Sequence, residues 1–178
     1  MSDTFICAYT LNGDGSGTAL DEAGLTSSSA ADKPLWVHLS ARSAGARRWL
    51  EKDAQLPDET LVDALLAEDT RPRMQVREAG VLLILRGVNL NGSAEPEDMV
   101  SIRIWVENRR VSSVQLRDLR GVEDMRGLLE SGTGPVDIGD LVTTFIEGSI
   151  VRMSPVMGDL ADGIDELEDR ILQMDLSG

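Results

Sequence analysis

The sequence contains only one cysteine and one histidine among its 178 residues, Cys7 and His38. A single cysteine allows no internal disulfide, which is typical of a reducing compartment. With one cysteine and one histidine, a single chain can form neither a zinc site of several His and Cys ligands nor a Ser-His-Asp catalytic triad with a second histidine as an additional base. We interpret Cys7 as a small buried residue of a strand and His38, next to Trp36, as a structural histidine. The chain is therefore not expected to be an enzyme.

Long apolar runs are also missing, because no uninterrupted stretch reaches the roughly 18 residues that can cross a bilayer. The start, Met-Ser-Asp-Thr, lacks the basic and apolar regions of a secretion signal, so we expect a cytoplasmic location. Basic residues are few, with 17 Lys and Arg against 31 Asp and Glu and a net charge of −14. This charge repels phosphate backbones and attracts small cations, so nucleic acid is not an expected partner.

The residues that are present predict one folded unit, with 42% apolar and 27% charged residues. Alternation and turn residues predict strands over residues 4–11, 35–39, 73–78, 81–89, 100–106 and 111–116. Helices are expected over residues 44–52, 58–67 and 118–130, the last ending at the glycines of residues 132–134. Residues 81–85 are apolar on both faces, as in a central strand that helices cover on both sides.

A long helix is predicted from Asp137 onward. Apolar residues recur there at alternating three- and four-residue spacing: Ile146, Ile150, Met153, Met157, Leu160, Ile164, Leu167, Ile171 and Met174. Leaving such a stripe in water forfeits roughly 1.5 to 3 kcal/mol per large side chain. We therefore expect a piece of a longer polypeptide, or a subunit whose stripe meets another copy. Pro155 predicts a kink or a break near Ser154.

Two segments invite a metal-binding interpretation. Residues 12–17 (NGDGSG) begin like a calcium loop, but the twelfth loop position holds Ala23 in place of the required glutamate. We interpret this segment as a strand connector. The predicted last helix carries the carboxylates of Asp159, Asp162, Asp165, Glu166, Glu168, Asp169 and Asp175. They form either the solvated face of an amphipathic helix or a surface that attracts hydrated divalent cations weakly.

Two strings, residues 63–74 (DALLAEDTRPRM) and residues 80–89 (GVLLILRGVN), resemble the cytoplasmic amino-terminal part of CorA-type divalent-cation transporters, within them the ZntB zinc-transporter branch. Further segments agree in order: residues 35–39, 100–106, 111–115, 132–135 and 165–169. The resemblance implies an α/β fold, with a mixed parallel and antiparallel sheet sandwiched between helices and followed by a long C-terminal helix. We divide the chain into an α/β domain (1–135) and a helix (136–178) that would lead toward a stalk and membrane helices.

The resemblance also implies a function and a site. Full-length relatives are homopentamers whose pore carries a Gly-Met-Asn signature, which this sequence lacks. In some relatives an acidic residue shortly before an Arg-Pro pair binds regulatory cations, and Asp63 occupies that place, one residue farther from Arg71-Pro72 than in the magnesium branch. Asp63 is therefore the candidate metal residue, with weak binding of Zn²⁺ or Mg²⁺ and no tightly bound cofactor.

The leading hypothesis is a regulatory and assembly domain at the cytoplasmic face of the inner membrane, which belongs to a transporter of zinc or a related divalent cation. The alternative is a soluble coiled-coil adaptor whose apolar stripe binds a partner helix.

Overall fold

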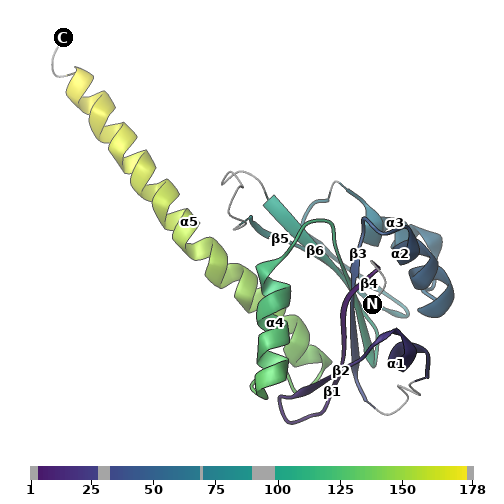
Figure 1. Ribbon diagram of the computed structural model, residues 1–178. Helices are drawn as coiled ribbons and strands as arrows, with labels where there is room; N and C mark the ends of the chain where they lie inside the picture. The colour runs from purple at the N-terminus through teal and green to yellow at the C-terminus, as the bar shows by residue number, and fades with distance from the viewer. Residues whose placement is uncertain (1–3, 28–32, 69, 90–98, 176–178) are drawn as a thin grey trace.

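A seven-stranded mixed sheet forms the centre of the computed structural model, which describes residues 4–27, 33–68, 70–89 and 99–175 (Figure 1). The strands are β1 (Phe5–Leu11), β2 (Gly17–Ala19), β3 (Leu35–Ser40), β4 (Arg73–Arg77), β5 (Gly80–Val88), β6 (Met99–Val106) and β7 (Arg110–Gln115). Their order in the sheet is β2-β1-β3-β7-β6-β5-β4. The pair β3 and β7 is parallel, and the other neighbouring pairs are antiparallel. The predicted mixed sheet is confirmed.

Helices cover both faces of this sheet. They are α1 (Glu22–Ser27), α2 (Ala44–Arg48), the π-helix η1 (Trp49–Asp53), α3 (Glu59–Leu66), α4 (Arg120–Ser131) and α5 (Ile138–Asp175). Leu50 of η1 and Leu61 and Leu65 of α3 are buried in the core on one face. Val122 of α4 and Phe145 of α5 are buried in the core on the other face. The result is a three-layer α/β fold, as predicted.

The alternation along β3 shows how the sequence assigns side chains to the two cores. Leu35, Val37 and Leu39 lie in the core under α3, whereas Trp36 lies in the core under α4. Strand β5 follows the same rule, but it lies next to the edge strand β4 and not at the centre of the sheet. Its residues Leu82 and Ile84 are buried, whereas Leu83 and Leu85 are only partly buried. Strand β5 thus lies inside the sheet, between β4 and β6, and contributes side chains to both cores, as the apolar residues on its two faces predicted.

Helix α5 starts in the body of the protein and then leaves it (Figure 1). The Asp137 carboxylate caps its first turn by accepting a hydrogen bond from the Asp140 N–H at 2.9 Å. The helix then continues past Pro155 without interruption to Asp175, so of the kink or break expected near Ser154 the break is wrong, and the kink stays a prediction. Pro155 and Val151 are both exposed. Because the carbonyl that loses its N–H donor belongs to Val151, solvent water can replace that bond.

Candidate functional site

The predicted metal residue Asp63 lies on α3 with its carboxylate in an ion pair. Asp58 caps this helix by accepting a hydrogen bond from the Leu61 N–H at 2.7 Å. Asp63 lies further along the helix, and its side chain is 58% exposed. The Asp63 Oδ1 atom lies 2.6 Å from Nη2 of Arg47 in α2. The same guanidinium lies 3.2 Å from Glu51 Oε1, and these hydrogen bonds, first to Asp63, raise the pKa of Arg47. A cation that binds Asp63 has to compete with Arg47.

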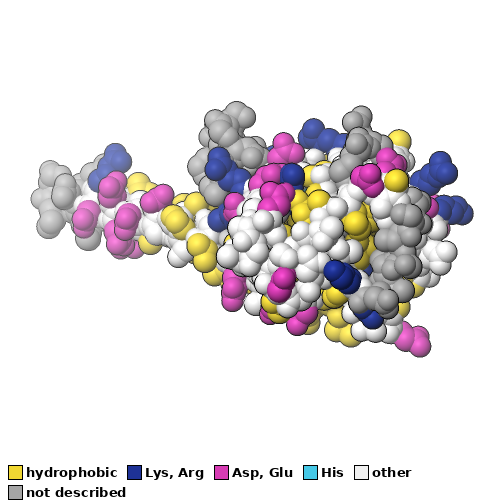
Figure 2. Space-filling model, turned by 60° about the horizontal axis from the view of Figure 1, so that its bottom comes forward, with side chains coloured by type: hydrophobic (Ala, Val, Ile, Leu, Met, Phe, Trp, Pro, Cys, Tyr) yellow, Lys and Arg dark blue, Asp and Glu magenta, His cyan; other side chains and the backbone are white. Residues whose placement is uncertain are grey.

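The carboxylates of α5 lie beside the apolar stripe on the projecting part of the helix (Figure 2). The stripe residues Met157, Leu160, Ile164, Leu167 and Ile171 are 55% to 61% exposed. Every described acidic side chain from Asp159 to Asp169 is exposed as well. Over residues 4–27, 33–68, 70–89 and 99–175, no three His, Cys, Asp or Glu side chains gather in a way that could hold a metal ion. Neither Asp63 nor the α5 carboxylates form a closed coordination site within the described residues.

The glycine-rich segment is the connector between β1 and β2, as predicted. Its oxygen donors are already used, because Asp14 Oδ1 accepts from both the N–H and the hydroxyl of Ser16 at 2.9 and 2.7 Å, bonds that lower the pKa of Asp14. Gly15 has φ +89°, and its carbonyl accepts from the Gly134 N–H at 2.7 Å. A Cβ atom at Gly15 would meet the Gly132 carbonyl oxygen at 2.8 Å. The turn therefore docks against the α4–α5 connection.

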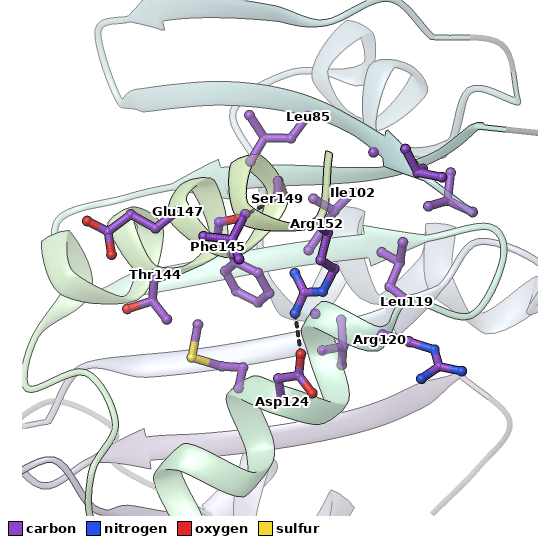
Figure 3. A pocket seen from close by; sticks show the side chains of 18 of the residues that line it. Leu85, Ile102, Leu119, Arg120, Asp124, Thr144, Phe145, Glu147, Ser149 and Arg152 are labelled. Atoms are coloured by element: carbon purple, nitrogen blue, oxygen red, sulfur yellow. Dashed lines mark hydrogen bonds and ion pairs between the residues drawn. The ribbon is translucent and has the colours of Figure 1, made fainter. Parts of the chain in front are cut away.

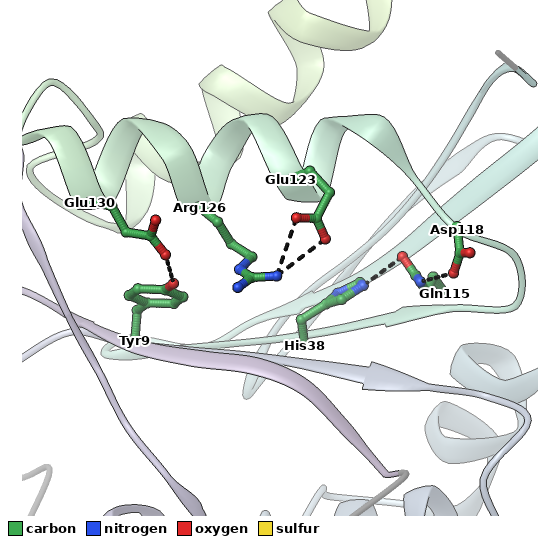
Figure 4. Close-up of polar contacts among 7 residues, drawn as sticks. All are labelled: Tyr9, His38, Gln115, Asp118, Glu123, Arg126 and Glu130. Atoms are coloured by element: carbon green, nitrogen blue, oxygen red, sulfur yellow. Dashed lines mark hydrogen bonds and ion pairs between the residues drawn. The ribbon is translucent and has the colours of Figure 1, made fainter. Parts of the chain in front are cut away.

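His38 lies in a buried hydrogen-bonded chain between β3 and β7. The Ser113 hydroxyl accepts from Trp36 Nε1 at 2.8 Å and lies 2.7 Å from His38 Nδ1. Gln115 Nε2 donates to Asp118, so its Oε1 faces His38 Nε2 at 2.9 Å (Figure 4). With these partners, the His38 ring is neutral, donates a hydrogen bond from Nε2 and accepts one at Nδ1. Burial lowers the pKa of His38 to about 4, so the predicted structural role is supported.

Other polar contacts on this face attach α4 to the sheet. Tyr9 of β1 donates to Glu130 at 2.6 Å, and Arg126 pairs with Glu123 one turn away (Figure 4). Cys7 is buried below them, and burial raises the pKa of its thiol to about 12. A thiol with such a pKa is not a nucleophile at neutral pH, so the interpretation of Cys7 as a small buried residue holds.

The neutral His38 predicts that the protein loses stability in acid. An unfolded histidine binds its proton near pH 6.5, whereas the folded one does so only near pH 4. The unfolded state therefore takes up the proton first as the pH falls, and the folded state loses about 3 kcal/mol between pH 7 and pH 4 through this group alone. Urea unfolding of the parent and of His38→Gln across this range measures it. Equal slopes with pH in both proteins would contradict the assignment.

Arg103 is a buried polar residue that the sequence pattern did not single out. Its side chain has 0% exposure in β6. The Nη2 group donates to the carbonyls of Ala67 and Glu68 at 2.5 and 3.3 Å, at the carboxyl end of α3. Burial lowers the pKa of Arg103. Carbonyls at the end of a helix carry partial negative charge, so Arg103 attaches the end of the helix that carries Asp63 to the sheet.

A pocket of about 390 Å³ lies between α4, α5 and the ends of β5 and β6 (Figure 3). Apolar side chains from all four elements line it, among them Leu85, Ile102, Met125 and Phe145. Arg152 of α5 points into the space between the two helices and pairs there with Asp124 of α4. The pocket thus lies at the base of the projecting helix.

Among the described residues, no helix is both long enough and apolar enough to span a membrane. A family profile described as "CorA-like Mg2+ transporter protein" matches residues 31–177. The zinc transport protein ZntB of Pectobacterium atrosepticum is 32% identical over 93% of this chain and 50% of its own length. The divalent cation transporter CmaX of Pseudomonas aeruginosa is 36% identical over 93% and 50%. The chain therefore spans about half the length of these relatives.

Solved structures agree with these matches. The full-length CmaX structure is similar with a TM-score of 0.84 at 36% identity, covering 94% of this chain and 52% of that one. The ZntB cytoplasmic domain from Vibrio parahaemolyticus has a TM-score of 0.78 at 27% identity, covering 92% and 64%. This is a family of transporters and not of enzymes. The chain belongs to the CorA-like Mg2+ transporter protein family and corresponds to the cytoplasmic domain of its ZntB branch.

Proposed function

We propose that this chain is the cytoplasmic regulatory and assembly domain of a transporter for zinc or a related divalent cation at the inner membrane. The observation that carries the proposal is α5, a long helix that leaves a folded α/β body with its apolar stripe uncovered, in a chain whose relatives are divalent-cation transporters. An adaptor that binds a foreign helix would explain the stripe but not these relatives.

The stripe supports the assembly role. Its five members beyond Pro155 whose side chains are described (Met157, Leu160, Ile164, Leu167 and Ile171) lie on one side of α5. Water contact at so many large apolar side chains is unfavourable, and their covering by other copies removes it. We infer that copies of the domain gather through α5, in the homopentamer that the family resemblance implies.

The acidic surface supports the regulatory role. A net charge of −14 raises the local concentration of divalent cations over the surface. Asp63 is the proposed weak binding residue, and Arg47 acts as the positive group that occupies it when no metal is bound. Because Arg47 also pairs with Glu51, displacement of Arg47 would present two carboxylates to one hydrated cation.

Isothermal titration of the chain with ZnCl₂ and MgCl₂ tests this role. We expect a dissociation constant on the order of 0.1 to 1 mM, as for exposed carboxylate sites. Asp63→Asn should abolish the binding, whereas Arg47→Gln should tighten it because the competing cation is gone. Asp162→Asn, which removes an exposed carboxylate of α5, is the matched control and should change little. Absence of binding to the parent and to Arg47→Gln up to millimolar metal would refute the regulatory role.

A further inference from the structure

The segment of α5 from Gly148 to Pro155, called here the weak segment, contains three residues that weaken a helix. Gly148 has no side chain that could pack against the body, and glycine has a low helix propensity. Ser149 Oγ donates to the Phe145 carbonyl at 2.8 Å, a bond that competes with the helical ladder and bends helices. Pro155 provides no N–H for the Val151 carbonyl. One missing helical bond, one competing side-chain bond and one glycine therefore fall within about two turns of α5.

One ion pair crosses between helices at this segment. Arg152 of α5 pairs with Asp124 of α4, 28 residues earlier in the chain. Two glycines make the space for its guanidinium. A Cβ atom would lie 2.9 Å from Arg152 Nη1 if built on Gly148, and 3.3 Å from it if built on Gly121. The guanidinium therefore lies close against the backbone of both helices, and the bond to Asp124 fixes its position.

The contact of α5 with the body ends shortly after this segment, where Met153 and Val156 are half-buried. Leu141 and Phe145 are buried before the weak segment, whereas the described side chains from Met157 onward are exposed. The pocket of about 390 Å³ lies directly beside Arg152, so a change in helix direction there meets open space and not a packed core. Among the described residues, the Arg152–Asp124 ion pair joins this part of α5 to α4, next to the half-buried side chains of Met153 and Val156.

We propose that residues 148–155 are a hinge in α5 and that the Arg152–Asp124 ion pair is the latch that holds the projecting half at one angle to the α/β body. The hinge and the ion pair together set the direction in which the apolar stripe of α5 faces other copies of the chain. This arrangement is a property of this chain alone, so its failure would leave the proposed transporter role untouched.

Pulsed electron–electron double resonance, which measures the distance between two spin labels, tests the hinge. Cysteines replace Gln75 on β4 and Asp165 on α5, both exposed, while the buried Cys7, with its raised pKa, stays unlabelled. Dilution with unlabelled chain restricts the distances to those within one molecule. We expect one narrow distance distribution in the parent, and a shifted or broadened one in Arg152→Gln and in Asp124→Asn. Unchanged distributions in both variants would overturn the proposal.

Two further variants separate the latch from a general effect of charge or folding. Arg170→Gln removes a positive charge from the exposed part of α5 and should leave the distribution as in the parent. Pro155→Ala restores a helical N–H donor, and in the Asp124→Asn background it should narrow the distribution again. A distribution that stays broad in that double variant would show that the missing N–H of Pro155 does not allow the bending, which contradicts the hinge. Circular dichroism establishes that each variant is folded.

Discussion

Replacing Arg103 by alanine should lower the free energy of unfolding by about 3 kcal/mol or more, because each hydrogen bond from a charged donor contributes roughly 1.5 to 3 kcal/mol. The substitution leaves the carbonyls of Ala67 and Glu68 without the donor that they now share and opens a cavity at a fully buried position. For a domain of this size the loss corresponds to a fall in melting temperature of roughly 6 to 12 °C. Thermal and urea unfolding measure both quantities.

Two variants make this result specific. Arg109→Ala removes an exposed arginine from the turn between β6 and β7 and should change stability by less than about 0.5 kcal/mol. Arg103→Met keeps much of the side-chain volume but donates no hydrogen bonds, so it should remain clearly less stable than the parent. If Arg103→Ala unfolds at the same urea concentration as the parent, Arg103 does not attach α3 to the sheet.

Replacing Leu160, Ile164 and Leu167 together by serine should abolish self-association of the chain while leaving the α/β body folded. These side chains are 55% to 59% exposed in the single chain, and their burial between copies is the main force that we assign to assembly. Sedimentation velocity should give a species heavier than the 19.3 kDa chain for the parent and a monomer for the variant. The melting temperature of the body should change little, because the three residues lie beyond its core.

A matched variant on the opposite side of the same helix separates apolar contact from any change to α5. Replacing Asp162, Glu166 and Asp169 by serine alters three exposed positions, each two residues from a stripe position and hence on the other side of the helix. This variant should still associate, and more strongly, because like charges on neighbouring copies are removed. Loss of association in both triple variants would mean that the stripe is not the interface.

Six of the seven strands were predicted, most of them from the alternation of apolar residues, whereas the three-residue strand β2 was not. The pattern was misleading for the buried face of β6. In β6 the alternation of Ile102 and Ile104 with Arg103 suggested one buried face, yet Arg103 and Trp105 on the other face are also fully buried. The tryptophan was a signal that helices cover that face as well. The burial of Arg103 was not predictable, since its acceptors come from carbonyls 35 and 36 residues away.

The position of the candidate site could be predicted from the sequence, but the ion pair in which its carboxylate lies could not. The resemblance placed Asp63 on a helix before Arg71-Pro72, and α3 confirms the helix, while its metal-binding role stays a proposal. The pairing with Arg47, 16 residues away on another helix, depends on tertiary packing. The same holds for the Arg152–Asp124 pair. Residues 91–98, which separate the strands predicted over residues 81–89 and 100–106, lie outside the described residues, as do the side chains from residue 172 onward.

The most direct test of the central claim, that the α5 stripe is where copies of the domain meet, is disulfide cross-linking of single-cysteine substitutions under mild oxidation. Ile164→Cys places a thiol in the stripe, and Glu166→Cys places one on the opposite side of the helix. The buried Cys7 is present in both variants as a thiol that should not cross-link. We expect rapid cross-linking of two copies through position 164 and little through position 166. Equal cross-linking at both positions, or none at 164, would contradict it.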